Sequence, residues 1–286
     1  MSSDGPFGPV VNGTQIVFYE YRPNKPAAIT FIALFGLATL CHLVYLVLFR
    51  AWFSMPLILG GVGEAFGYYG RCRSSDTPDI ARPFILQNLL ILASAPFIAA
   101  TMYMTLGRII VAMNARRHAL ISPRWLTKIY ILIDIGCVAT QVIGSVLPAS
   151  GEESAIELSK QILLGGLITQ VAALALFALT CWHAHRRIKS GQPLPDLTIS
   201  WQNHFRTLEV ATLLLVVRSV VRSVEYLQGE GGFVVSHEVF IYVFDALPMF
   251  LIMVAFAVLH PARLIKDARR LMGDWEGHAM LDRTGK

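Results

Sequence analysis

Residues 27–49 read AAITFIALFGLATLCHLVYLVLF and contain no charged side chain. A helix of about 20 apolar residues crosses the roughly 30 Å hydrocarbon layer of a bilayer, so this stretch is long enough to span a membrane. The whole chain has the same character, because 55% of its 286 residues are apolar, 15% are charged and the mean hydropathy is +0.55. An average soluble domain carries about 25% charged residues. The sequence therefore predicts a polytopic membrane protein rather than a soluble enzyme or a disordered chain.

Seven stretches of the chain have the length and apolar character of membrane-spanning helices. They are 27–49, 52–70, 83–107, 125–147, 161–182, 207–227 and 239–259. The first, third and fifth contain no charged residue, whereas the other four carry ionisable side chains within otherwise apolar sequence. We expect an all-α fold in three parts, with an N-terminal segment 1–26, a transmembrane domain 27–260 and a basic tail 261–286.

Lysine and arginine are unevenly distributed between the connecting segments. If the N-terminus lies outside, the inner loops and the tail carry a clear excess of these residues over the outer segments. Positive charge accumulates on the cytoplasmic side of membrane proteins, so we expect an extracellular or lumenal N-terminus and a cytosolic C-terminus. The sequon that begins at Asn12 would then be accessible to N-glycosylation.

Several function classes lack support in the sequence. The basic residues follow the pattern of topology signals rather than of a phosphate-binding face, so nucleic acid is not an expected partner. No phosphate-binding G-x-x-x-x-G-K-[S/T] motif occurs, the four cysteines are spread singly, and the histidines are too scattered in depth to share one ion. We therefore expect a non-enzymatic protein without a metal or cofactor.

Ionisable residues inside the predicted spans cost at least a few kcal/mol each unless they find a partner or a wet cavity. Arg218, Arg222 and Glu225 share one helical face, because they are spaced i, i+4 and i+7. With the N-terminus outside, the polar residues of the second, third, sixth and seventh spans gather in the outer half of the membrane. This candidate substrate-binding set comprises Glu64, Arg71, Gln87, Arg218, Arg222, Glu225, Glu238 and Asp245. Asp134 falls closer to the middle or inner half and is a candidate relay residue.

Three interpretations of this outer cluster remain open: a clamp that locks the helices together, a polar substrate-binding chamber, and a proton relay. Gly63 and Gly67 on the second span have a simpler interpretation, since small residues four apart favour close helix packing.

Several stretches, in order along most of the chain, carry a family resemblance. They are YEYRP at 19–23, FGLATLCH at 35–42, GGVGEAFGYYGR at 60–71, SAPFIAATMYMTLGR at 94–108, ISPRWLTKIYILIDI at 121–135, GGLITQ at 165–170 and VRSVVRSVEYLQGEGGFVVSHEVFIYVFDALPM at 217–249. Together they resemble the fungal RTA-like, or lipid-translocating exporter, family, which is named for resistance to aminocholesterol.

The resemblance implies a seven-span protein of the plasma membrane, or alternatively of an internal membrane. Members of that family are associated with resistance to toxic sterols, azoles and other lipophilic compounds, with release or translocation of sphingoid long-chain bases, and in one branch with porphyrin movement. The expected function is therefore to bind and move amphipathic lipids or to confer resistance to lipophilic toxins. A seven-helix receptor or lipid sensor that binds its ligand without transport is the alternative. The expected partners are membrane lipids and an amphipathic ligand, and no protein partner is indicated.

Overall fold

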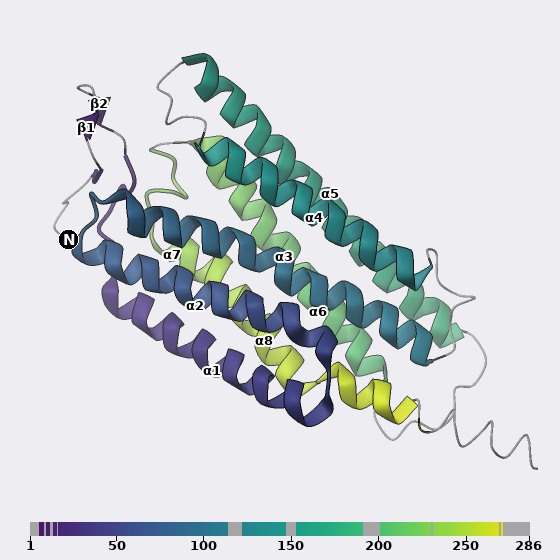
Figure 1. The fold of residues 1–286 in the computed structure, drawn as a ribbon. Coiled ribbons are helices and arrows are strands. Elements are labelled where there is room, and N and C mark those ends of the chain that lie inside the picture. Colours follow the sequence, from purple (N-terminus) through teal and green to yellow (C-terminus); the bar gives the residue numbers. More distant parts are fainter. Residues whose placement is uncertain are drawn as a thin grey trace, which may run out of the picture.

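The computed structural model describes residues 6–8, 10–11, 14–15, 17–113, 122–146, 153–190, 201–229, 231–268 and 270. Figure 1 shows an elongated bundle of long helices with the N-terminal segment at one end. The first six helices are α1 Lys25–Phe49, α2 Met55–Asp76, α3 Ala81–Ala112, α4 Pro123–Val146, α5 Glu153–Ser190 and α6 Trp201–Gln228. The seventh is continuous and comprises α7 Val239–Ile241, the π-helical turn η4 Tyr242–Ala246 and α8 Leu247–Val258.

Three short elements precede α1 or α2. The 3-10 turn η1 Trp52–Ser54 leads into α2. Strands β1 Val10–Val11 and β2 Thr14–Gln15 pair antiparallel near the N-terminus. The prediction of an all-α chain with seven long helices is confirmed, apart from this two-residue ladder.

Five of the described helices are long and apolar enough to cross a membrane. They are Lys25–Phe49, Ala81–Ala112, Trp125–Gly144, Leu158–Ser190 and Val239–Ala268. Helices α2 and α6 are long enough, but each carries several ionisable side chains that lower its apolar character. Many large apolar side chains on the outside of the bundle, such as Leu37, Val47 and Leu132, are exposed. Lipid is the solvent that suits this surface, and the chain is a multi-pass integral membrane protein.

Some helix bounds differ from the predicted spans. Helix α5 covers 153–190 rather than 161–182, and α6 begins at Trp201 rather than at 207. In both cases the helix continues through polar residues, which end an apolar stretch but do not break a helix. The basic tail was expected to begin as a surface helix, and residues 261–268 are helical. Their side chains Leu264 and Ile265 are nevertheless buried and join the hydrophobic core.

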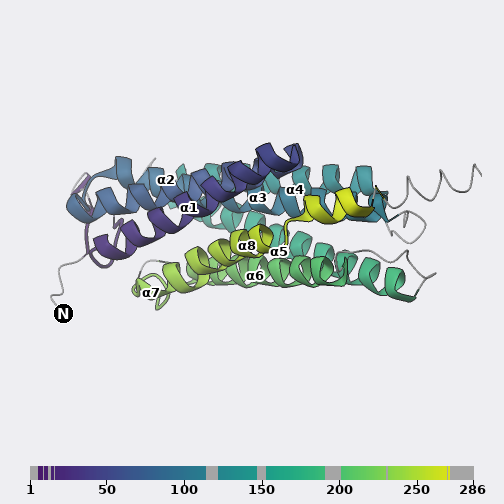
Figure 2. The ribbon, with the colours of Figure 1, turned by 90° about the horizontal axis from the view of Figure 1, so that it is seen from below.

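The helices form a closed ring in sequence order. Each of α1 to α6 packs against its neighbours in the chain, α6 packs against α8, and α8 packs against α1. Helix α3 also contacts α6 across the ring. Figure 2 shows α1 to α4 in one layer, with α6 and α8 in a second. This closure brings the polar residues of α2, α3, α6 and the seventh helix to face one another.

Helix α2 approaches α3 through a line of glycines. Gly60, Gly63, Gly67 and Gly70 recur at the helical period, and a Cβ at each would meet side-chain or backbone atoms of α3. At Gly70 those atoms are the Pro83 carbonyl oxygen and the Gln87 backbone nitrogen, each 2.9 Å from the Cβ position. The predicted close packing at Gly63 and Gly67 is confirmed.

Candidate functional site

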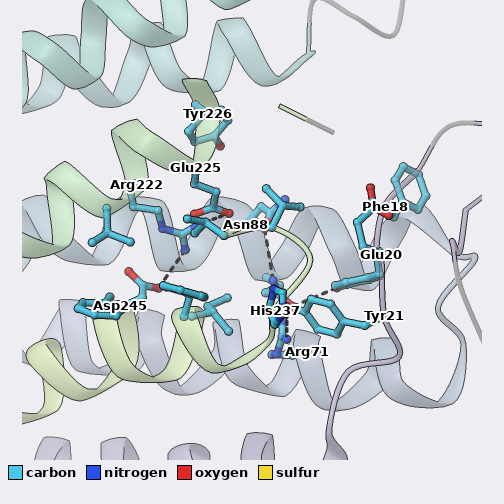
Figure 3. A pocket seen from close by; sticks show the side chains of 18 of the residues that line it. Phe18, Glu20, Tyr21, Arg71, Asn88, Arg222, Glu225, Tyr226, His237 and Asp245 are labelled. Atoms are coloured by element: carbon cyan, nitrogen blue, oxygen red, sulfur yellow. Dashed lines mark hydrogen bonds and ion pairs between the residues drawn. The ribbon is translucent and has the colours of Figure 1, made fainter. Parts of the chain in front are cut away.

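A pocket of about 290 Å³ lies at the end of the bundle that carries the N-terminal segment. Its wall is built from residues 17–21, from α2 and α3, from the C-terminal end of α6, from the loop that follows it and from the start of the seventh helix. Figure 3 shows its charged side chains, with Arg222 between Glu225 and Asp245 and with Arg71 near Tyr21. The pocket therefore combines segments from both ends of the chain.

Arg222 is the centre of one ionic group. Its guanidinium donates to Asp245 Oδ2 at 2.9 Å and to Glu225 Oε2 at 3.1 Å, one turn along α6. Arg218 forms an ion pair with the same Asp245 and donates to the Ile91 carbonyl of α3 at 3.1 Å. Asp245 thus pairs with two arginines and links α6 to the seventh helix.

The backbone around Asp245 is unusual. Residues Tyr242–Ala246 form a π-helical turn, and Pro248 follows at the start of α8. Short π-helical turns inside α-helices are rare and frequently occur at functional sites. Here the turn carries Asp245 on the buried side, against Arg218 and Arg222.

Arg71 is the centre of a second ionic group. Its guanidinium donates to Glu238 Oε1 at 2.8 Å, to the Tyr21 hydroxyl at 3.0 Å and to the Tyr242 hydroxyl at 3.1 Å. Its Cζ also lies 5.3–6.0 Å from the ring centres of Tyr19, Tyr21 and Tyr242, a distance at which cation–π attraction contributes. Arg71 therefore connects α2, the N-terminal segment and the start of the seventh helix.

The N-terminal segment 17–24 forms one wall of the pocket through specific polar contacts. The Tyr19 hydroxyl donates to Gln87 Oε1 at 3.0 Å, and Glu20 Oε1 accepts from the Gly231 backbone N–H at 2.9 Å. Burial raises the pKa of the Tyr19 and Tyr21 phenols above the usual value, so both hydroxyls are protonated at physiological pH. The segment is thereby attached to α3 and to the loop after α6.

Glu64 lies beneath these groups in the core and is fully buried. Neither carboxyl oxygen has a hydrogen-bond partner within the described part of the chain. Arg218 and Arg222 are close enough for electrostatic interaction, but their ion pairs go to other carboxylates. The sequence prediction placed Glu64 among the paired charges, and the structure places it beside them without a pair.

The structure brings together most of the predicted site residues. Arg71, Gln87, Arg218, Arg222, Glu225 and Asp245 line the pocket, Glu238 binds Arg71 from its edge, and Glu64 lies below. Asp134 lies apart in a second cavity, between α3 and α4. Asn12 falls outside the described residues. Among those that are described, no three His, Cys, Asp or Glu side chains gather as a metal site would require.

The sequence argument missed the aromatic and N-terminal members of the site. Tyr19, Glu20, Tyr21 and Tyr242 all line the pocket or bind Arg71, and none was a candidate residue. Residues 19–21 precede the first span and carry no intramembrane charge, so the cost of burying charge could not identify them. The signal that could have done so was the motif at 19–23, whose hydroxyls and carboxylate suit a polar pocket.

Comparison with known proteins places the chain in a family. The model of the family described as RTA1 like protein matches residues 57–268. This range contains α3 to α8 and all but the first two residues of α2. A search of solved structures gave no significant match.

Three curated relatives from Saccharomyces cerevisiae match over most of their length. Protoporphyrin uptake protein 1 is 31% identical over 279 residues, covering 85% of this chain and 91% of that protein. Protein RTA1 is 27% identical, covering 85% of this chain and 84% of its own. The sphingoid long-chain base transporter RSB1 is 27% identical, covering 90% of this chain and 76% of its own. The chain therefore belongs to the RTA1-like family of membrane proteins.

Proposed function

We propose that this protein binds amphipathic compounds with a cationic head group in the pocket at the N-terminal end of the bundle, and moves them across or out of the membrane. The observation that carries the proposal is the lining of this pocket, where carboxylates lie beside the aromatic rings of Phe84, Phe240 and Phe244. An amphiphile needs both, since its head group requires charge and its tail requires apolar surface. The names of the relatives RSB1 and RTA1 support a role in lipid transport or resistance.

The accessibility of the charges favours a cationic head group. Arg71 and Arg218 are almost fully buried, Arg222 is 13% exposed, and all three are held in ion pairs. Glu225 is 30% exposed and is the most accessible carboxylate among these ion pairs. A ligand that enters the pocket therefore meets negative charge before it can reach an arginine, and an amine suits this surface better than an acid.

The orientation follows from the charge distribution along the chain. With the N-terminus outside, the pocket lies in the outer half of the membrane, and we propose the plasma membrane as its location. A tag at residue 2 should then be accessible on intact cells, and a tag after Lys286 should not. Protection of the N-terminal tag would overturn this orientation.

The test of function is a flux assay with a fluorescent sphingoid base in vesicles that contain the purified protein. Glu225→Gln keeps the side-chain shape but removes the accessible charge, and we expect it to slow flux strongly. Glu209→Gln is the matched control, because Glu209 lies on the same helix, is 29% exposed and pairs with His185 away from the pocket. Flux should be unchanged in this control.

Two outcomes would contradict the proposal. Equal flux in the two variants would exclude Glu225 from binding. Saturable binding without flux in the unmodified protein would favour the alternative function of a receptor or lipid sensor, for which the same pocket would hold the ligand without moving it.

A further inference from the structure

A second cavity lies on the membrane-facing side of the bundle, between α3 and α4. It shares no lining residue with the first pocket. It has a volume of about 270 Å³. Ala100 is one of its lining residues on α3 and lies 12 residues along that helix from Asn88 of the first pocket. At 1.5 Å rise per residue, Ala100 lies roughly 18 Å from Asn88 along α3, and Ala93, the lining residue nearest the first pocket, lies roughly 7.5 Å from it. We name the second cavity the lateral groove.

The sequence explains why a groove forms at this place. Ala93, Pro96 and Ala100 share one face of α3 at spacings of three and four residues, and their small side chains leave space beside α4. On α4 the facing residues Ile131, Asp134 and Ile135 follow the same helical period. Ile135 is exposed on the outer surface, so the groove borders the region where lipid chains lie.

Among the described residues, Asp134 is the only ionisable one that lines this groove. It is 3% exposed, and its Oδ2 has no hydrogen-bond partner within the described part of the chain, although the Tyr103 hydroxyl lies close to the carboxyl group. Nor does any described lysine or arginine form an ion pair with it. A carboxylate placed in apolar surroundings inside a membrane is costly unless a cation or a proton neutralises it.

We propose that the lateral groove is a second binding site, for a lipophilic primary amine that enters from the bilayer. The ammonium group would pair with Asp134, and the alkyl chain would lie along the apolar side chains of α3 and α4. An ion pair formed here would be strong, because the other residues that line the groove are apolar and screen charge weakly. Binding of an amine in the groove rests on Asp134 and the groove lining alone. The role of the groove as an entry site for transport rests on the proposed function.

The test is photo-labelling of the purified protein in phosphatidylcholine nanodiscs with octadecylamine that carries a diazirine in its chain. We expect labels on 93–104 and 131–138, in addition to labels near the first pocket. Asp134→Asn should reduce labelling of the groove by at least about tenfold, since each factor of ten corresponds to about 1.4 kcal/mol of lost binding free energy. The matching alcohol, which has the same chain and no charge, should label the groove far less than the amine does.

Control variants separate this inference from the proposed function. Glu225→Gln should reduce labelling only at the first pocket, around Phe240 and Phe244, and leave groove labelling intact. Ala93→Phe fills the groove and should abolish its labelling while Asp134 is still present. Groove labelling that survives Asp134→Asn, or that is equal for amine and alcohol, would overturn the second site and leave the first pocket untouched. If Glu225→Gln loses labelling at the first pocket and keeps it in the groove, the result would support both the first pocket and the groove as separate binding sites.

Discussion

Replacing Arg71 by leucine should loosen the N-terminal segment, which would keep its contacts to Gln87, Gly231 and Glu238. Arg71 is 1% exposed and donates to Glu238, Tyr21 and Tyr242, so the substitution removes the buried cation that these three groups share. Removing one member of a buried ion pair costs about 3–5 kcal/mol, because the other charge is left unpaired. Glu238 is 20% exposed and water would stabilise it in part, so we expect the lower limit, about 3 kcal/mol.

This free energy can be converted to an unfolding temperature. At roughly 2–4 °C per kcal/mol for chains of this order of size, Arg71→Leu should lower the apparent unfolding temperature by at least about 6 °C. The assay is thermal unfolding of the detergent-purified protein. Cleavage by chymotrypsin at Tyr19 and Tyr21 reports release of the segment directly, since both rings are held against Arg71 in the folded protein.

The matched control is Lys25→Met, which breaks an ion pair at the same end of the bundle. Lys25 and Asp76 are 45% and 48% exposed, and ion pairs in such contact with solvent add little to stability. This variant should unfold close to the unmodified protein and remain resistant to chymotrypsin. If Arg71→Leu behaves as Lys25→Met does, the buried pair does not hold the segment and the reasoning is refuted.

Three further outcomes are expected. Asp245→Asn should sharply reduce the yield of folded protein, because it removes a carboxylate shared by two arginines, whereas Glu225→Gln should leave the yield near normal. Size-exclusion profiles of fluorescent fusions compare the two variants, and a lower yield for Glu225→Gln than for Asp245→Asn would contradict the assigned pairing. Gly70→Ala should destabilise by about 1–3 kcal/mol, since the new Cβ would lie 2.9 Å from backbone atoms of α3, whereas Gly36→Ala, which faces open space, should unfold no earlier than the parent. Resistance to chymotrypsin at Tyr21 should stay constant to about pH 9 and fall as pH rises beyond 10. The pKa of Tyr21 is higher in the folded state, so ionisation of the phenol favours the unfolded segment. A loss of resistance below pH 8 would exclude this cause.

The number of helices and their approximate positions were predictable because apolar length is a property of local sequence. The ends of α5 and α6 were not, since a helix can extend into polar sequence at little cost and nothing in the apolar pattern marks where it stops. The π-helical turn at Tyr242–Ala246 was equally invisible, because one residue more per turn leaves no pattern in five residues of sequence.

The charged residues of the candidate site on the helices were predictable, whereas their pairing and the N-terminal and aromatic residues were not. The cost of burying charge selected Arg71, Arg222 and Asp245 correctly as neighbours of one cavity. Which carboxylate meets which arginine depends on side-chain reach and helix rotation, and these are fixed only by tertiary packing. Glu64 illustrates the difference, since its depth matches the cluster while its oxygens have no partner within the described residues.

The glycine line between α2 and α3 constrains how the pocket can open. Backbone-to-backbone contact at Gly70 leaves no layer of side chains that could slide, so these two helices should translate as a single rigid body. Within the described residues, no glycine contact of this kind joins α6 to the seventh helix, and Arg218 and Arg222 of α6 reach Asp245 of the π-helical turn through long side chains. Any motion that widens the cavity would therefore be a displacement of α6 and the seventh helix against a fixed α2–α3 frame.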